Sequence, residues 1–269
     1  MGGFFMRKIK KVLSVVIILV LLPYIVTIFF SGKAANAEAN SLLDEYCIGV
    51  FAKEVSSDYE DEMLKVQAVI VRTTVYQNVN EIVAEDVSKL ELDRAWRSRL
   101  ERAWKETEGQ VLMYGDELAL LPFHYISNGK TRSGEEVLES TSYPYLKVKE
   151  CLADLECEEQ LSVQMLELSD AEVVKKDSAG YVVEVKVGEM VQSGEKFREE
   201  YGLASSSFDL QSFSEVTRVI TKGIGHGLGL SQYSANEMAK EGKSYQEILQ
   251  FFYEGTELKE VAEILWNGE

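Results

Sequence analysis

Apolar and polar positions follow one another along this chain in patterns that predict both helices and strands. Residues 63–77 place apolar side chains on nearly every side, which predicts a helix buried in the core. Residues 181–187 and 216–220 alternate apolar and polar positions, as half-buried strands do. The fold class that these patterns predict is α+β, with mixed, mainly antiparallel strands and packed helices in one domain of two lobes.

Further segments add strands and a helical insertion to this picture. Residues 46–52 form an apolar stretch that indicates a buried strand. Residues 110–114 and 118–125 flank Gly115–Asp116, and a two-residue turn that starts with glycine is typical of a β-hairpin. The charged stretch 78–108 predicts a helical insertion that packs on the core.

The N-terminal segment has the pattern of a membrane anchor. Residues 12–30 carry no charged side chain and are long enough to span a bilayer as a helix. The basic residues within 1–11 predict a cytoplasmic tail. Residues 31–41 read as a linker, and 42–269 as an extracytoplasmic domain held at the cell membrane by a single pass. A cleaved signal peptide is the alternative, because residues 35–37 resemble a cleavage site.

Charge and cysteine content narrow the classes of ligand. The formal net charge of −17 argues against binding nucleic acid or anionic membranes through a global field. The three cysteines, Cys47, Cys151 and Cys157, are too few for a disulfide framework. Cys151 and Cys157 could be paired, free, or zinc-bound with His124. Because their spacing matches no familiar zinc motif, we expect no metal and no cofactor.

The run from residue 223 to 229 places glycine at every second position and His226 in the middle. If the run is extended, one face is bare backbone, and such a glycine content indicates close approach of another group. A tight glycine-rich corner packed on a neighbouring strand is the alternative. Two helices are expected to follow, because Ser234–Glu237 and Ser244–Glu247 have the spacing of a capping box.

Three stretches carry a family resemblance. Residues 225–233 read GHGLGLSQY, residues 54–55 (Glu-Val) precede LKVQAVIVRT at 64–73, and His124 precedes SNGKT at 127–131. Together they resemble the motifs of the stage II sporulation protein D family of cell-wall lytic enzymes, over roughly residues 45 to 260. The most specific part of the resemblance is the C-terminal glycine-rich signature.

The resemblance implies a peptidoglycan lytic transglycosylase, which cleaves between N-acetylmuramic acid and N-acetylglucosamine and leaves a 1,6-anhydro product. It assigns the catalytic acid and base to Glu54, and we expect Phe51 and Val55 to form an apolar wall that keeps this carboxyl protonated. Ile224 and Ser234 depart from the family pattern, where tryptophan and glycine are common. The substrate-binding groups that we predict are Lys65, Arg72, His124, Tyr145, His226, Gln232 and Tyr233. Arg72 is equally open to a structural role.

The resemblance also implies partners and a setting. The substrate would be glycan strands of peptidoglycan, preferably denuded of stem peptides by a cell-wall amidase partner. The setting would be septal-wall remodelling during sporulation engulfment.

Two other functions compete with the enzyme. A non-catalytic wall-binding module that enhances a partner amidase would keep the glycine run without needing Glu54. Metal-dependent hydrolysis through His124 and His226 is the weaker of the two, because the chain has two histidines and no H-E-x-x-H motif.

Overall fold

A computed structural model describes residues 43–77 and 92–261. The chain divides into two compact units, residues 1–49 and 50–269. Residues 43–49 are helical, and the elements named below belong to the second unit. The predicted tail, anchor and linker lie outside the described residues. Within the described ranges, no helix has the length and apolarity needed to cross a membrane.

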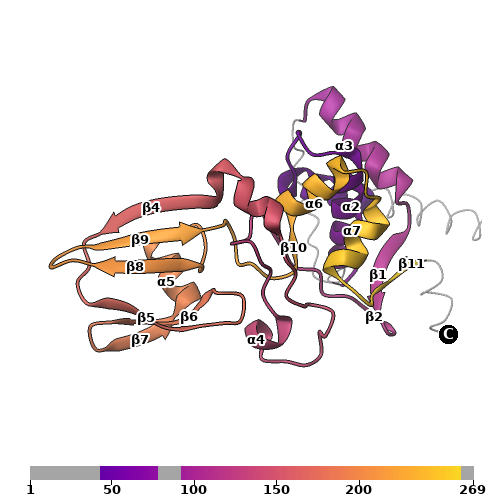
Figure 1. Ribbon diagram of the computed structural model, residues 1–269. Helices are drawn as coiled ribbons and strands as arrows, with labels where there is room; N and C mark the ends of the chain where they lie inside the picture. The colour runs from indigo at the N-terminus through magenta and orange to yellow at the C-terminus, as the bar shows by residue number, and fades with distance from the viewer. Residues whose placement is uncertain (1–42, 78–91, 262–269) are drawn as a thin grey trace, which may run out of the picture. The chain divides into compact units, whose positions relative to one another are not determined.

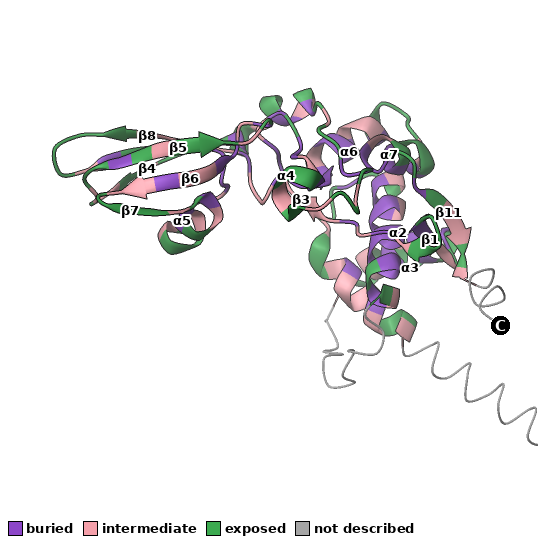
Figure 2. Cartoon of the chain, turned by 90° about the horizontal axis from the view of Figure 1, so that it is seen from below, coloured by how far each residue is buried: buried purple, intermediate pink, exposed green. Residues whose placement is uncertain are grey.

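The helix predicted at 63–77 is confirmed as α2 (Asp61–Gln77), and it is the centre of one part of the second unit. Its acidic first turn, Asp61 and Glu62, complements the partial positive charge of a helix N-terminus. The side chains are buried along most of its length (Figure 2). Three helices pack around it (Figure 1), namely α3 (Arg94–Glu106), α6 (Gln232–Lys240) and α7 (Tyr245–Phe252).

An antiparallel sheet of order β11-β1-β2 covers part of the same helix. Its strands are β1 (Gln110–Tyr114), β2 (Glu117–Leu118) and β11 (Glu257–Glu260). The hairpin between β1 and β2 turns at Gly115–Asp116, as predicted. The strand expected at 118–125 is shorter, because only the end of β2 and β3 (Phe123–His124) are extended and paired.

The other part of the second unit contains two three-stranded antiparallel sheets. One has the order β4-β9-β8, formed by β4 (Leu161–Leu166), β9 (Thr217–Lys222) and β8 (Phe208–Ser212). The other has the order β5-β6-β7, formed by β5 (Ala171–Lys176), β6 (Val182–Val187) and β7 (Met190–Ser193). Helix α5 (Gly194–Tyr201) packs on β6 and β7. The two strands predicted at 181–187 and 216–220 are confirmed.

A compact apolar cluster holds these two sheets and α5 together. Its buried members are Val182, Val185, Phe197, Leu203, Phe208 and Val219. They come from β6, α5, β8, β9 and the segment after α5. Because both sheets contribute inward-facing side chains, neither could bury its apolar face alone.

Segments from the middle and the C-terminal part of the chain join the two parts. Strand β3 pairs in parallel with β10 (Leu230–Ser231), and Ile126 forms an isolated bridge with Ile224. Short helices α4 (Gly134–Leu138), η3 (Leu152–Glu156) and η4 (Glu158–Gln160) lie along the same connection. The β3–β10 pair places His124 opposite Ser231, at the start of α6.

Two local predictions need correction. Residues 46–52, expected as a buried strand, are helical, because a short apolar stretch fits a buried helix as well as a strand. The N-cap of α6 is Ser231 rather than Ser234. The capping box of Ser244 and Glu247 at the start of α7 is confirmed. Of the predicted insertion, residues 78–91 lie outside the described residues, and α3 confirms a helix in the remainder.

Candidate functional site

The glycine run 223–229 forms a tight packed loop, and not the extended strand that we expected. All four glycines have positive φ, a region that residues with a Cβ rarely adopt. A Cβ on Gly227 would overlap the ring of Tyr181, and one on Gly229 would overlap the carbonyl oxygen of Pro122. The expected close approach is therefore confirmed, but the approaching groups belong to the protein itself. The structure matches the glycine-rich corner that was the alternative.

Two histidines fix the backbone of this loop at Leu228. The Nδ1 atom of the buried His124 lies 3.2 Å from the Leu228 carbonyl oxygen, and the Leu228 N–H donates to Nδ1 of His226 at 3.0 Å. A carbonyl oxygen only accepts, so His124 carries its proton on Nδ1 and its Nε2 is an acceptor. This Nε2 is buried and has no hydrogen-bond partner in the described part of the protein. The loop backbone therefore sets the tautomer of His124.

Both imidazoles are neutral at neutral pH. Burial, together with the neighbouring His226, whose ring centroid lies 5.8 Å away, lowers the pKa of His124 to about 3. The pKa of His226 is also lowered, chiefly by burial. The two side chains can therefore serve as hydrogen-bond partners, and they do not supply positive charge.

Helix α6 is bonded to the segment that carries Glu54. The Gln232 side-chain amide donates to the Glu54 carbonyl oxygen at 2.7 Å, and its own carbonyl accepts from the Tyr59 hydroxyl at 3.3 Å. The Glu60 N–H donates to the Asn236 side chain at 2.8 Å. Two residues of α6 thus hold residues 54–60 in place. The C-terminal signature and Glu54, far apart in the sequence, meet in the fold.

The side chain of Glu54 is exposed to solvent. Phe51 is fully buried and Val55 is half-buried, so Phe51 belongs to the core and does not form the apolar wall expected around the carboxyl group. Tyr233 and His226 are also half-exposed. These three predicted site residues, Glu54, His226 and Tyr233, are the ones whose side chains a ligand could reach directly.

The geometry favours a structural role for Arg72. Its guanidinium is buried and donates to the carbonyl oxygens of Thr107 at 2.7 Å, Gln110 at 3.1 Å and Trp104 at 3.0 Å. It also stacks on the Trp104 ring at 3.8 Å. These contacts join α2 to the end of α3 and the start of β1, and they turn the guanidinium away from any ligand.

Lys65 and Tyr145 are likewise engaged by the protein. Lys65 forms ion pairs with Glu62 at 2.7 Å and Glu106 at 2.8 Å. Burial tends to lower the pKa of Lys65, but the bonds to Glu106 and Glu62 outweigh it and raise the pKa. The Tyr145 hydroxyl accepts from the Leu120 N–H at 2.8 Å, and burial raises its pKa to about 12. The proposed site therefore does not include Lys65, Arg72 or Tyr145.

A buried carboxylate that the sequence did not reveal fixes the start of α6. Asp154 on η3 accepts from the Ser127 N–H at 2.7 Å, from the Ser231 hydroxyl at 2.8 Å and from the Ser234 hydroxyl at 2.6 Å. Ser231 is the N-cap of α6, where the helix dipole favours negative charge. Because Ser231 directly precedes Gln232, Asp154 also fixes the position of Gln232.

A second missed residue, Arg132, ties the glycine loop to the two-sheet part. It forms a 2.6 Å ion pair with Asp177, with side chains only 6% and 2% exposed, and a 2.9 Å pair with Glu195. It also donates to the His226 carbonyl oxygen at 3.3 Å. Its only sequence signal is that it directly follows the SNGKT motif, and the acidic partners are too distant in the chain to be recognised by spacing.

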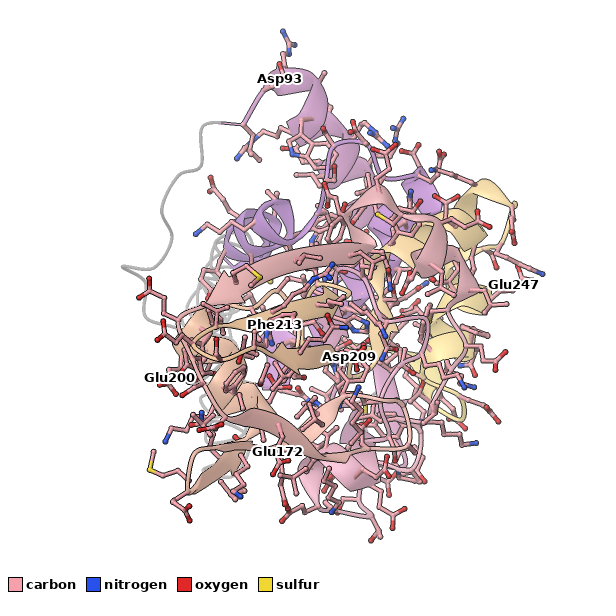
Figure 3. All side chains as sticks on the ribbon, turned by 60° about the vertical axis from the view of Figure 1, so that its left-hand side comes forward. Asp93, Glu172, Glu200, Asp209, Phe213 and Glu247 are labelled. Atoms are coloured by element: carbon pink, nitrogen blue, oxygen red, sulfur yellow. The ribbon has the colours of Figure 1, made fainter. Side chains whose placement is uncertain are left out.

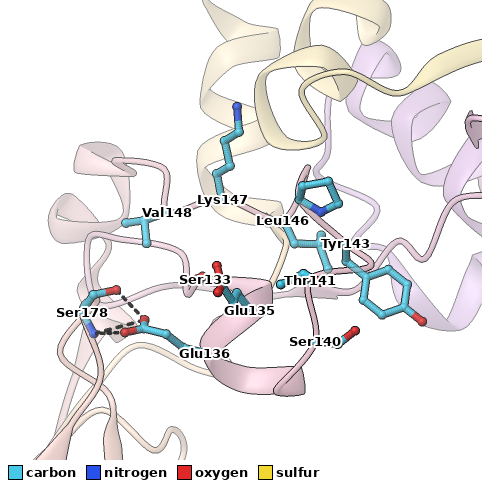
Figure 4. A pocket seen from close by; sticks show the side chains of 11 residues that line it. Ser133, Glu135, Glu136, Ser140, Thr141, Tyr143, Leu146, Lys147, Val148 and Ser178 are labelled. Carbon is cyan, nitrogen blue, oxygen red and sulfur yellow. Dashed lines mark hydrogen bonds between the residues drawn. The ribbon is translucent and has the colours of Figure 1, made fainter.

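Neither the cysteines nor the cavity beside α4 belongs to the predicted substrate site. Cys151 and Cys157 form no disulfide with each other, and burial raises the pKa of Cys151 to about 12. In the described ranges no three histidine, cysteine or acidic side chains come together as metal ligands. A cavity of about 470 Å³ beside α4 (Figure 4) is lined by Glu136, which bonds Ser178, and by Tyr143 and Lys147 among others. None of its lining residues was predicted for the site.

Comparison with known proteins finds sequences similar to this chain. Residues 32–114, which include Glu54 and α2, match the model of the family described as Stage II sporulation protein. The chain is similar to the stage II sporulation protein D family, and the resemblance that we derived from its motifs is confirmed.

Particular relatives extend the match to most of the chain. Stage II sporulation protein D of Bacillus subtilis (strain 168) is 29% identical, over 85% of this chain and 78% of the relative. The protein of the same name from Bacillus amyloliquefaciens is 28% identical, over 84% and 76%. A more distant relative from Bacillus subtilis, named Amidase enhancer, is 24% identical, over 78% of this chain and 40% of its own length. The names of these relatives refer to sporulation and to the enhancement of an amidase.

Proposed function

We propose that this protein is a peptidoglycan lytic transglycosylase in which Glu54 acts first as an acid and then as a base. The Glu54 carboxyl donates its proton to the oxygen that leaves with N-acetylglucosamine. The C6 hydroxyl of the muramyl residue attacks C1, and the Glu54 carboxylate takes the proton of that hydroxyl. One glycosidic bond breaks, one 1,6-anhydro bond forms, and no water is consumed.

The observation that carries this proposal is the hydrogen bond from Gln232 to the Glu54 backbone. An acid that must meet a glycosidic oxygen needs a fixed backbone, because misplacement by about 1 Å can cost roughly a hundredfold in rate. Tyr233 lies beside Gln232 on α6, and the His226 loop precedes this helix in the chain. We therefore assign Gln232 to positioning, and Tyr233 and His226 to contact with the sugars.

Bound glycan completes the site. The Glu54 carboxyl is exposed in the free protein. A glycan strand laid over it would exclude water and favour the protonated acid. Denuded strands are the proposed substrate, and a cell-wall amidase that removes stem peptides is the proposed partner. The proposed location is the cell membrane, with the segment 12–30 as anchor and the catalytic domain outside.

The test compares Glu54→Gln with a matched change, Glu60→Gln, at a second exposed glutamate of the same segment. Each purified full-length protein is incubated with denuded glycan strands, and the products are analysed by mass spectrometry. We expect anhydro-ended fragments from the parent protein and from Glu60→Gln, and none from Glu54→Gln. Release of such fragments by Glu54→Gln at the parent rate would remove Glu54 from its assigned role.

The second candidate is a wall-binding module that stimulates an amidase, and the relative named Amidase enhancer favours it. That function would keep the packed glycine loop and would not need the carboxyl of Glu54. Intact strands that still co-sediment with the protein, together with unchanged stimulation of an amidase by Glu54→Gln, would support the module.

A further inference from the structure

The edge of the β4-β9-β8 sheet carries an uncovered apolar stripe. Strand β4 is the outermost strand of this sheet, with β9 on one side (Figure 1), and no described strand pairs with its other edge. Leu161, Val163 and Met165 alternate along β4 and are 58%, 54% and 56% exposed. Leu166, on the opposite face, packs against the apolar cluster between the sheets. One face of β4 thus stabilises the fold, and the other presents apolar side chains to solvent.

Natural edge strands are protected by short length, charged side chains, proline or bulges. Strand β4, with the sequence LSVQML, has no charged residue and no proline, and it pairs with β9 from Leu161 to Leu166 without a register shift. A regular free backbone edge beside an apolar stripe is the requirement for β-strand addition.

The charges around the stripe define what can dock there. Exposed acidic residues flank both ends, Glu158 and Glu159 before the strand and Glu167 and Asp170 after it. The basic residues of the same sheet face lie on β9, one strand further from the edge, with Arg218 opposite Met165. Phe213, at the β8–β9 turn, and Asp209, on β8, lie on the far side of β9 from this edge (Figure 3).

Self-association through β4 is disfavoured by these charges. Antiparallel pairing of two copies would bring Glu158 and Glu159 of one copy against Glu167 and Asp170 of the other. Parallel pairing in register would set each acidic end against itself. Like charges opposite one another destabilise strand pairs, and the net charge of −17 adds repulsion between copies.

We propose that β4 is a docking edge for an extended segment of a partner protein, which adds a strand with alternating apolar side chains and basic residues at both ends. The added backbone bonds to the free edge of β4, and its apolar side chains cover Leu161, Val163 and Met165. Its basic ends meet the four acidic residues that flank the strand. This proposal stands independently of the glycan-cleaving function of Glu54.

Strand β7 provides a matched control within the same part of the protein. It is also an edge strand, of the β5-β6-β7 sheet, and Val191 is 58% exposed. Its other exposed apolar residue, Met190, is adjacent in the chain and so points to the opposite face. Strand β7 therefore has no apolar stripe.

The probe is a synthetic peptide of alternating valine and threonine with lysines at both ends, and its partner peptide carries glutamates instead. Binding to the full-length protein is measured by fluorescence anisotropy, and amide protection by hydrogen exchange. We expect saturable binding of the lysine-ended peptide, at least about tenfold weaker binding of the glutamate-ended one, and new protection within residues 161–166. Val163→Ser should weaken binding about tenfold, because it removes a central apolar contact, and Val191→Ser should leave it unchanged.

Several results would overturn the proposal. These are the absence of saturable binding, equal affinity for both peptides, protection outside β4, or an equal loss in Val191→Ser. A dimer of the parent protein that Val163→Ser abolishes would assign the edge to a second copy. The protection pattern of the parent protein decides the matter even if Val163→Ser alters the fold.

Discussion

Replacing Gln232 by alanine tests the contact on which the proposed site depends. The side chain is 6% exposed, and its amide bonds the Glu54 carbonyl, the Gln67 side chain and the Tyr59 hydroxyl at 2.7, 3.3 and 3.3 Å. Each net hydrogen bond contributes about 1 kcal/mol, and a buried partner left unpaired costs about 1–3 kcal/mol. Because Gln67 is fully buried and Tyr59 nearly so, we expect a loss of about 2–4 kcal/mol in the free energy of unfolding.

The measurement is urea unfolding followed by circular dichroism, with Gln250→Ala as the control. Gln250 is exposed and makes one hydrogen bond, to the Thr256 carbonyl at 2.6 Å, so its replacement should cost about 1 kcal/mol or less. A double-mutant cycle of Gln232→Ala with Tyr59→Phe should give a coupling energy of about 1 kcal/mol. Glycan cleavage by Gln232→Ala should fall at least about tenfold under conditions where the variant is folded. Equal stability losses at 232 and 250, with no coupling to Tyr59, would refute the idea that α6 fixes the Glu54 segment.

Three other changes test the surrounding structure. Gly227→Ala should cost more than about 3 kcal/mol in urea unfolding because its Cβ would overlap Tyr181, while Gly255→Ala, with positive φ but open space, should cost about 1 kcal/mol. Because the pKa of His124 falls from its ordinary 6.5 to about 3 on folding, the unfolded chain binds more protons below pH 6.5. The parent protein should therefore lose roughly 2 kcal/mol more than His124→Gln between about pH 6.5 and pH 5, and equal pH profiles would contradict this. Arg72→Lys should destabilise the fold by about 2 kcal/mol and leave glycan cleavage per folded molecule unchanged, whereas a selective loss of cleavage would return Arg72 to the substrate site.

The elements that depend on local pattern could be predicted from the sequence. The apolar character of residues 63–77, the glycine-first hairpin turn and the Ser244–Glu247 capping box each encode a local structure, and all three are confirmed. The apolar stretch 46–52 has no such local code, because its length and composition suit a helix and a strand equally. It was therefore assigned wrongly.

The candidate site likewise has residues that the local sequence predicts and contacts that only the fold reveals. A resemblance assigns Glu54, and the fold brings Gln232 to it, which no spacing in the sequence could show. The glycine run indicated a close approach, but only the structure shows that Tyr181 and Pro122 are the approaching groups. Asp154 and Arg132 were missed because a buried carboxylate or ion pair is recognised by partners that lie far apart in the chain.

The central claim is that Glu54 breaks the glycan without water. Its most direct test is digestion of denuded strands in water enriched in heavy oxygen, followed by mass spectrometry of the new ends. The account predicts 1,6-anhydro ends that carry no heavy oxygen, and their loss in Glu54→Gln. New reducing ends that contain heavy oxygen would show hydrolysis and contradict the account, and strands left uncut by the folded parent protein would contradict it as well.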